Sequence, residues 1–188
     1  MRSKVVLHVC CGPCATESIK RLKKDYTIVL FYPNSNIFPK DEWERRLKNA
    51  KKVAKLHSLS LIEGPYNHRG WLDFIKGWED EPEGGRRCRK CFEFNLQKTA
   101  EECQRFHIKN FTTTLTISPY KDSKKVFAVA KKIARQYNIN FLEKNFKEEE
   151  GFKNSVELSK SLNLYRQNYC GCEFSMRREK AGKFSCVY

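Results

Sequence analysis

The architecture follows from one segment near the start of the chain, Lys4-Val5-Val6-Leu7-His8-Val9-Cys10-Cys11-Gly12-Pro13-Cys14. Its first six residues are mostly apolar and β-branched, which predicts a short buried strand over residues 4–9. Gly12 and Pro13 predict a turn, and the apolar spacing of Ile19 and Leu22 predicts a helix over residues 14–24. The segment therefore begins an alternation of strand, loop and helix.

The same alternation continues along the chain. Further strands are predicted over residues 26–32, 60–63, 110–116 and 140–142, and helices over residues 40–57 and 123–137. Trp43, Leu47, Ala50 and Ala54 mark the apolar face of the first of these helices. Strands that alternate with helices of about ten residues or more indicate a parallel sheet with right-handed crossovers. We therefore predict an α/β fold with a Rossmann-like parallel sheet.

Two segments lie outside this alternation. Residues 67–107 form an insertion between the third and fourth strands, for which we expect mainly helices. Residues 143–188 form a cysteine-bearing tail of turns and short helices. The length of 188 residues suits a single α/β domain that carries both additions.

Seven of the nine cysteines fall in three clusters. The clusters are Cys10, Cys11 and Cys14, then Cys88 and Cys91, then Cys170 and Cys172. Thiolate pairs from distant segments are how proteins hold zinc or iron–sulfur clusters, and Cys10, Cys11, Cys88 and Cys91 supply four such ligands. A structural zinc ion is the alternative to an iron–sulfur cluster. Cys14 could replace one of its neighbours or simply begin the helix.

The Cys170-Gly171-Cys172 pair has different chemistry. Two cysteines that are one residue apart can close on each other as a strained, easily reduced disulfide. A metal centre together with a pair that stores two electrons is typical of a redox enzyme. The two remaining cysteines, Cys103 and Cys186, fit ordinary packing roles.

The compartment can also be predicted. Met1-Arg2-Ser3-Lys4 leads into an apolar run over residues 5–9 that is too short for a secretory leader. An odd cysteine count argues against a secreted disulfide scaffold. No apolar run approaches the ~20 residues that cross a bilayer. We expect a cytoplasmic protein with reduced thiols and no membrane partner.

The net charge of +15 predicts a polyanionic partner, with nucleic acid favoured over a membrane surface. Basic residues recur throughout the chain instead of forming one tail. In the tail, Arg166 stands between tyrosines and could grip a phosphate while its neighbours stack on bases.

Ligands of parallel α/β sheets bind beyond the carboxyl ends of the strands. Cys10 and Cys11 end the first predicted strand, and two polar loops belong at the same edge. The substrate-binding candidates in these loops and in the tail are Asn36, Thr113, Ser118, Tyr120, Lys121 and Arg166. Turn formation and helix capping are the alternative roles of the short polar residues among them.

Five separated motifs resemble one known family, the QueH-type epoxyqueuosine reductases. They are Cys10-Cys11-Gly12-Pro13-Cys14, Phe31-Tyr32 with Asn36-Ile37 and Pro39, Glu81-Pro82-Glu83-Gly84-Gly85-Arg86-Arg87-Cys88 with Cys91, Phe111-Thr112-Thr113-Thr114-Leu115 with Ser118-Pro119-Tyr120-Lys121, and Leu164-Tyr165-Arg166-Gln167 with Tyr169-Cys170-Gly171-Cys172. The resemblance covers nearly the whole chain.

The resemblance implies the last step of queuosine synthesis, the reductive removal of the epoxide oxygen from epoxyqueuosine at the wobble position of tRNA. It implies a [4Fe-4S] cluster on Cys10, Cys11, Cys88 and Cys91, a redox-active Cys170–Cys172 pair, and no cobalamin. An external donor would supply electrons, and an additional iron beside the cluster is a further option. The alternative function is that of a tRNA-binding or tRNA-thiolating protein with a structural metal.

The predicted topology is also similar to that of the adenine-nucleotide-hydrolase and ATP-pyrophosphatase-like domains. Those domains carry a Ser-Gly-Gly phosphate loop after the first strand, where this chain has Cys10-Cys11-Gly12-Pro13. Pro13 has no backbone N–H to offer a phosphate. We therefore expect that the protein does not use ATP.

Overall fold

The computed structural model describes residues 2–179. Five parallel strands form one sheet in the order β3-β2-β1-β4-β5. They are β1 (Ser3–His8), β2 (Tyr26–Tyr32), β3 (Leu61–Glu63), β4 (Asn110–Thr113) and β5 (Asn140–Phe141). The sequence-based prediction of a Rossmann-like α/β fold is therefore confirmed. Cys186 lies outside the described residues.

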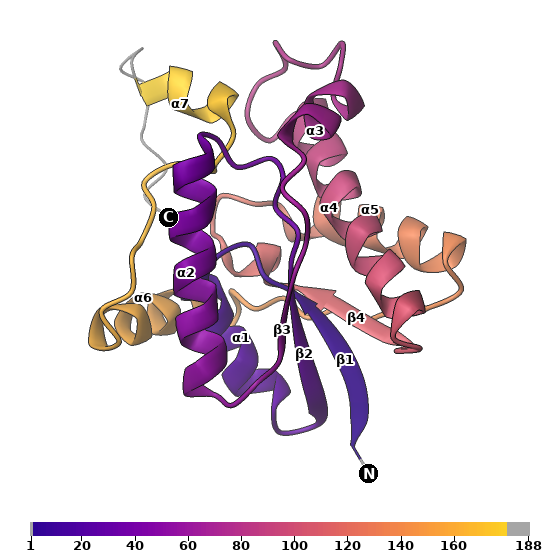
Figure 1. The fold of residues 1–188 in the computed structure, drawn as a ribbon, viewed down its shortest axis with the longest axis vertical. Coiled ribbons are helices and arrows are strands. Elements are labelled where there is room, and N and C mark those ends of the chain that lie inside the picture. The colour runs from indigo at the N-terminus through magenta and orange to yellow at the C-terminus, as the bar shows by residue number, and fades with distance from the viewer. Residues whose placement is uncertain (1, 180–188) are drawn as a thin grey trace.

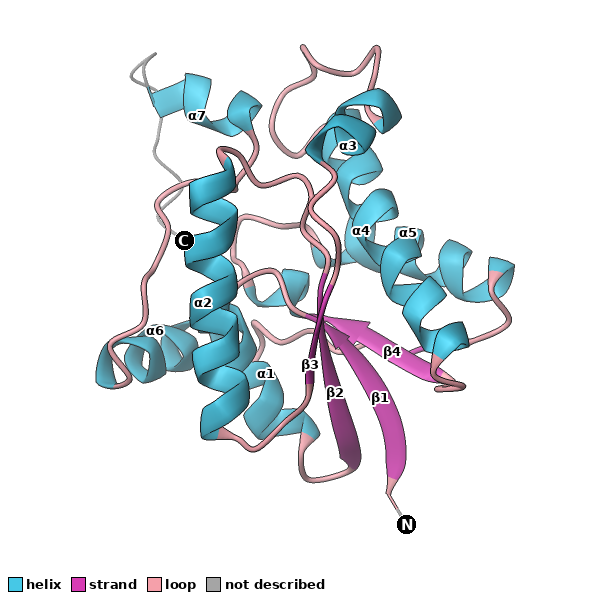
Figure 2. Ribbon diagram, viewed as in Figure 1, coloured by secondary structure: helices cyan, strands magenta, loops and turns pink. Residues whose placement is uncertain are grey.

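The helices pack on both faces of this sheet. They are α1 (Gly12–Leu22), α2 (Lys40–Leu56), α3 (His68–Phe74), α4 (Arg86–Arg105), α5 (Ser123–Gln136), α6 (Gly151–Ser161) and α7 (Glu173–Glu179). Helices α1 and α2 lie on one side of the strands and α4 and α5 on the other, while α6 packs against α1 (Figure 2).

The pleat of β1 divides the core between these two layers. Val5 and Leu7 point toward α1 and α2, whereas Val6 points toward α4 and α5 and packs with Phe111 of β4. All of these side chains are fully buried. Because successive side chains of a strand face opposite sides, a continuous apolar run is what a sheet covered on both faces requires.

Helix α1 begins at Gly12, two residues before the predicted start. Pro13 occupies the first turn, where its missing N–H costs no intrahelical hydrogen bond. At Gly12, a Cβ atom would lie 2.8 Å from the backbone carbonyl of Asn49 in α2, so glycine permits the close approach of these two helices. The expected turn at Gly12 and Pro13 is therefore the first turn of the helix itself.

Strand β4 ends at Thr113, whereas the sequence predicted a strand up to residue 116. The Thr113 hydroxyl accepts a hydrogen bond from the backbone N–H of Leu115 at 3.1 Å and turns the chain into a 3₁₀ helix, η1 (Thr114–Ile117). A threonine side chain that bonds locally in this way competes with continuation of the strand. The turn keeps Thr114 beside the end of β1.

The strands point from the amino-terminal end of β1 toward the centre of the molecule, and the α3–α4 connection and α7 lie beyond their carboxyl ends (Figure 1). Residues 67–107 contain the helices α3 and α4, and the tail contains α6 and α7. Among residues 2–179, no helix is both long enough and apolar enough to cross a membrane. All three cysteine clusters lie at or beyond the carboxyl edge of the sheet.

Candidate functional site

The first cysteine cluster lies where β1 leaves the sheet. The backbone N–H of Cys10 donates to the Thr114 hydroxyl at 3.0 Å, and this hydroxyl donates to the Cys10 Sγ atom at 3.2 Å. Cys11 is the residue that precedes α1, and Cys14 follows in its first turn. One hydroxyl from the neighbouring strand's exit thus fixes both the backbone and the sulfur of Cys10.

The thiols of Cys10, Cys11 and Cys14 form a compact trio whose sulfur atoms all lie within 4.8 Å of one another. Hydrogen bonds from Cys10 and then from Cys14 lower the pKa of Cys11 well below its usual range. The hydrogen bond with Cys11 raises the pKa of Cys10 to about 12, and the hydrogen bonds with Cys10 and Cys11 raise the pKa of Cys14 well above its usual range. The trio therefore favours one thiolate that is stabilised by two thiols, a soft anionic donor set that suits a metal.

The second cluster lies on the first turns of α4. Cys88 Sγ accepts a hydrogen bond from the Gly84 N–H at 3.2 Å, and Cys91 Sγ accepts one from the Asn95 amide at 3.7 Å. Burial, followed by the charges of Cys172 and Cys170, raises the pKa of Cys91 well above its usual range. Burial and the charge of Cys170 raise the pKa of Cys88 as well. The second and third clusters are therefore electrostatic neighbours.

The third cluster divides its two thiols between different surroundings. Cys170 borders a cavity, whereas Cys172 is buried against Trp71 and Phe174 with Cys91 packed beside it. Burial and the neighbouring Cys170 raise the pKa of Cys172 to about 11. Gly171 between them has φ +134°, and a Cβ atom there would lie 3.0 Å from the Arg46 guanidinium. Within residues 2–179, every cysteine is a free thiol.

One small cavity of about 40 Å³ joins the three clusters. It is bordered by Cys10 and Cys14 from the first cluster, Cys91 from the second and Cys170 from the third. Three of the predicted substrate-binding residues, Asn36, Ser118 and Lys121, also border it. The structure thus brings chain segments that are more than a hundred residues apart to one polar, thiol-rich space.

The other predicted substrate-binding residues do not border this cavity. Thr113 is buried, with its hydroxyl 2.8 Å from the His8 Nδ1 atom. Tyr120 is exposed, and Arg166 turns to α6, where it donates to the Ser159 hydroxyl at 3.0 Å and lies over Phe152. Thr113 therefore positions the cavity residue His8, whereas Arg166 packs the tail against α6.

Asn34, from the polar loop that was expected at this edge, borders the cavity as well. The cavity residues that were not predicted as site residues from the sequence are His8, Arg46, Asn95 and Gln167. His8 was expected to be a packed core residue, and it is buried, but its Nε2 atom has no hydrogen-bond partner in the described part of the chain. Burial lowers the pKa of His8 to about 4, so the ring is neutral at physiological pH. Asn95 Oδ1 is also buried and has no hydrogen-bond partner among residues 2–179.

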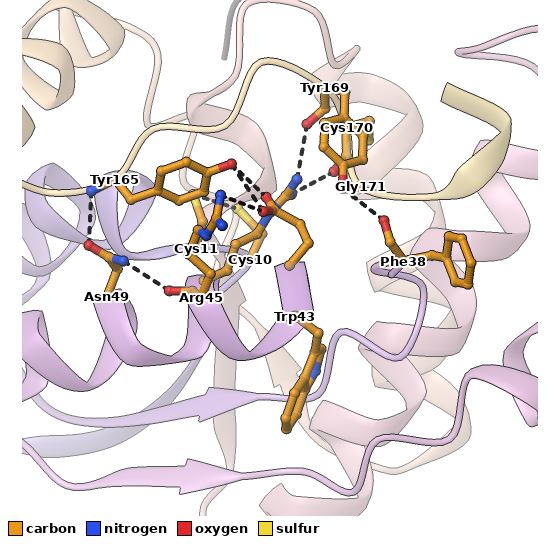
Figure 3. A network of polar contacts seen from close by, with 12 residues as sticks. Cys10, Cys11, Phe38, Trp43, Arg45, Asn49, Tyr165, Tyr169, Cys170 and Gly171 are labelled. Atoms are coloured by element: carbon orange, nitrogen blue, oxygen red, sulfur yellow. Dashed lines mark hydrogen bonds and ion pairs between the residues drawn. The ribbon is translucent and has the colours of Figure 1, made fainter. Parts of the chain in front are cut away.

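Arg46 holds the cysteine-bearing tail in place. This guanidinium is 2% exposed and forms an ion pair with Glu42 at 2.7 Å. It also donates to the backbone carbonyl of Cys170 at 3.0 Å and to that of Tyr169 at 3.3 Å, and it lies over the Tyr169 ring. Figure 3 shows the network to which these contacts belong.

Further hydrogen bonds in the same network hold the tail against α2 and the loop after β2. The Tyr165 hydroxyl donates to Glu42 at 3.0 Å, and the Tyr169 hydroxyl donates to the carbonyl of Phe38 at 2.8 Å. The backbone N–H of Phe38 donates in turn to the Gly171 carbonyl at 2.8 Å. Figure 3 shows Tyr165 and Tyr169 on either side of the drawn network, with Cys10 and Cys11 near it. The tail therefore reaches the cavity along α2 and the loop after β2.

Lys121 supplies positive charge to the cavity. Burial by itself would lower the pKa of this ammonium, but the charges of Cys170, Cys10 and Cys14 raise it. Lys121 is therefore a permanent cation between the first and third clusters. A half-buried cation of this kind favours thiolate over thiol in its neighbours.

A profile of the epoxyqueuosine reductase QueH family matches residues 5–178. The chain belongs to this family.

Curated relatives support the assignment. The chain is 38% identical over 186 residues to epoxyqueuosine reductase QueH of Thermotoga maritima, with 96% of this chain and 95% of the relative covered. It is 35% identical over 185 residues to the Streptococcus pyogenes serotype M1 protein of the same name, with 95% of this chain and 72% of the relative covered.

Among solved structures, the chain is similar to that of a predicted subunit of a tRNA methyltransferase from Methanocaldococcus jannaschii. The TM-score is 0.59 at 16% identity, and the match covers 84% of this chain and 74% of the other. At this identity the likeness concerns the fold alone.

The donor set fits a metal or an iron–sulfur centre. The sulfur trio has the spacing of ligands that converge on one site, and Cys91 borders the same cavity. Thiolates are soft ligands that select zinc, copper(I) and iron–sulfur clusters. The sequence left the role of Cys14 open, and the structure groups it with Cys10 and Cys11. The sequence contained a signal for this grouping. A helix that starts at Gly12 puts Cys11 and Cys14 on neighbouring positions at its first turn.

The tail anchor can be tested with two arginines that contact the same carboxylate. Arg46→Met should lower the free energy of unfolding by about 3–5 kcal/mol, because it leaves Glu42 buried without its ion-pair partner. Arg45 lies 3.9 Å from Glu42, but its side chain is 60% exposed, so Arg45→Met should cost less than about 1 kcal/mol. Denaturant unfolding of both variants measures the difference, and equal losses would show that Arg46 does not anchor the tail.

Proposed function

We propose that this protein reduces the epoxide of epoxyqueuosine in tRNA to the alkene of queuosine, as an oxidoreductase of the QueH family. The observation that carries the proposal is the convergence of three cysteine clusters on one cavity in a chain of this family. The curated relatives carry the name of this activity.

The reaction consumes as many electrons and protons as the Cys170–Cys172 dithiol can release. Removal of an epoxide oxygen as water breaks two C–O bonds, forms a C=C bond and consumes two electrons and two protons. The Cys170–Cys172 dithiol releases two electrons and two protons when it closes to a disulfide. An external two-electron donor then reopens the disulfide, so that one turnover converts epoxide and donor into alkene, water and oxidised donor.

We further propose that Cys10, Cys11, Cys88 and Cys91 hold a [4Fe-4S] cluster, which leaves Cys170 and Cys172 for electron storage. A cluster there would supply a Lewis-acidic iron and a store of electrons. Cys14 is the competing fourth donor, since its sulfur lies with those of Cys10 and Cys11. Whether an additional iron is present is decided by the same metal analysis.

The chain's own polar groups would orient the substrate. Asn36 and Ser118 can hydrogen-bond a bound nucleoside from the cavity wall, and the Lys121 ammonium can stabilise negative charge on the oxygen as its C–O bonds break. Neutral His8 offers an Nε2 atom that accepts or donates no hydrogen bond within residues 2–179. Of the two tail thiols, Cys170 borders the cavity, which supports a direct role of Cys170 in the reaction.

The partner would be tRNA that carries the modified wobble guanosine, recognised at its anticodon stem-loop. The net charge of +15 supports this assignment, because phosphates are the most abundant ligands for such an excess. Free, working thiols and a tRNA substrate both favour the cytoplasm. We propose that neither cobalamin nor ATP takes part.

The metal ligands can be separated by single substitutions. Cys10→Ala, Cys11→Ala, Cys88→Ala and Cys91→Ala should each abolish both turnover and iron and sulfide loading, because a cubane needs all four thiolates. Cys14→Ala should retain the cluster. The measurement is anaerobic iron and sulfide analysis together with the absorbance at roughly 400 nm, where iron–sulfur clusters absorb.

Cys103→Ser is the matched control, since Cys103 is a buried cysteine on α4 that lies outside the cavity. If Cys88→Ala keeps its full iron content and turnover while Cys14→Ala loses both, the fourth ligand is Cys14 and not Cys88. A colourless protein with one zinc ion would instead favour the tRNA-binding alternative with a structural metal.

Substitutions of Cys170 and Cys172 should affect electron transfer without affecting cluster assembly. Cys170→Ser and Cys172→Ser should keep wild-type iron and sulfide but stop multiple turnover, since one thiol cannot close a disulfide. Thiol counting before and after one turnover without external reductant should show the loss of two thiols in the wild type. An unchanged count would mean that the pair is structural.

RNA binding should be strongly dependent on salt. Each phosphate contact contributes about 0.9 to the log–log slope on duplex and about 0.7 on single strands. If the protein neutralises about 4 to 6 phosphates, affinity for the anticodon stem-loop should fall on the order of a hundredfold between about 50 and 200 mM salt. Fluorescence anisotropy measures this slope, and a flat salt profile would contradict tRNA as the partner.

A further inference from the structure

A second concave site lies on α4, on the side of the helix away from the cysteines. It is a groove of about 250 Å³, called here the Trp78 groove. Its lining consists of Trp78 from the α3–α4 connection, four residues of α4 and two residues of α5: Arg86, Arg89, Lys90, Glu93, Val129 and Lys132. None of these residues has a role in the reaction proposed above.

The lining of this groove has more cations than anions. Four of its residues are cationic and only Glu93 is anionic, and Arg86 lies 3.9 Å from Glu81 at the edge of the groove. Glu93 pairs with Lys90 at 3.2 Å and with Lys132 at 3.1 Å, which joins α4 to α5 across the groove. Arg89 is exposed and forms no ion pair with any residue in the range 2–179, so its guanidinium is available to a ligand.

The aromatic part of the groove is held rigidly. The Arg86 guanidinium lies 5.3 Å from the centre of the half-buried Trp78 ring. Behind it, the buried Arg87 guanidinium donates to the carbonyl of Glu79 at 2.7 Å and also to that of Glu81. The connection that carries Trp78 is thereby fixed in its path at the top of α4 (Figure 1). A fixed indole ring with an arginine on it loses little entropy when a flat ligand stacks there.

The helix places this groove close to the cysteine site. Cys88 and Cys91 are three residues apart on one face of α4, whereas Arg86, Lys90 and Glu93 follow the i, i+4, i+7 spacing of the opposite face. The separation is therefore about one helix diameter, roughly 10–12 Å. A few stacked nucleotides, at ~3.4 Å each, span that distance.

We propose that the Trp78 groove binds a nucleotide of the tRNA strand next to the modified nucleoside, with a base stacked on Trp78 and phosphates held by Arg86 and Arg89. The inference rests on the proposed function, because it requires the reacting nucleoside to remain part of an RNA strand at the cysteine site. Aromatic rings beside arginines are how proteins grip single-stranded RNA without reading its sequence. The loop of an anticodon stem-loop is single-stranded and meets this requirement.

The first test uses RNA binding alone, so that it does not depend on the reaction. Trp78→Ala should weaken binding of a fluorescein-labelled, unmodified anticodon stem-loop roughly thirtyfold, the middle of the range for loss of one stacked base. Trp78→Phe should recover most of that affinity because it retains an aromatic face. The double change Arg86→Ala with Arg89→Ala should reduce the log–log salt slope by about 0.7 for each lost single-strand phosphate contact.

The far end of the same helix provides a matched control. Arg105 lies 5.3 Å from the Phe106 ring centre, so it repeats the arginine–aromatic pair at the other end of α4. With α4 spanning Arg86–Arg105, the two pairs are about 28 Å apart at ~1.5 Å per residue. Phe106→Ala and Arg105→Ala should leave RNA affinity within twofold of the wild type. Iron content and circular dichroism of every variant establish that the fold and metal site are intact.

The outcomes distinguish the groove from the reaction. If Trp78→Ala and the double arginine variant bind RNA as tightly as the wild type, the groove proposal is wrong whatever the enzyme reduces. If these variants bind RNA normally and are slow only with a protein electron donor, the groove binds that donor and the proposal is again wrong. If the wild type binds the stem-loop through Trp78 but leaves the epoxide intact, the groove proposal stands and the proposed reaction fails.

Discussion

The buried Arg46–Glu42 pair is the interaction on which the assembled site depends. A guanidinium that is 2% exposed has lost most of its hydration, which costs several kcal/mol. Its hydrogen bonds to Glu42 and to the carbonyls of Tyr169 and Cys170 offset that cost. Those carbonyls belong to the tail, so the guanidinium can be satisfied only when Cys170 is in place at the cavity.

The second constraint is electrostatic. Seven thiols lie near one another in a region of low exposure, and they cannot all ionise, because each thiolate raises the pKa of its neighbours. Lys121, which borders the cavity, offsets part of this charge, and the thiols of Cys10 and Cys14 stabilise the thiolate of Cys11. Further ionisation requires more positive charge, which a metal or an iron–sulfur centre would supply.

Helix α4 connects the two parts of the molecule that the proposals concern. One face of its first turns carries Cys88 and Cys91 toward the cavity, and the opposite face lines the Trp78 groove. Because both faces belong to one rigid helix, RNA that binds the groove would be positioned relative to the cysteines without any movement of a loop. The buried Arg87 on the same turn ties α4 to the α3–α4 connection that carries Trp78.

The local pattern of the sequence determined the alternation of strands and helices, the two-sided burial of β1 and the placement of Cys10 and Cys11 at the carboxyl edge. These follow from β-branched apolar runs and helical spacing, which act within a few residues. Only the tertiary structure decided that Cys91 and Cys170 meet Cys10 at one cavity, that Cys172 is buried while Cys170 borders the cavity, and that Arg166 packs against α6. Such contacts join residues up to 160 positions apart along the chain (Cys10 and Cys170), and they depend on how each crossover packs on the sheet. Arg46 illustrates this difference. The sequence predicted the apolar face of α2 from residues such as Trp43 and Ala50 but not the role of Arg46, because the two carbonyls that satisfy its guanidinium come from the distant tail.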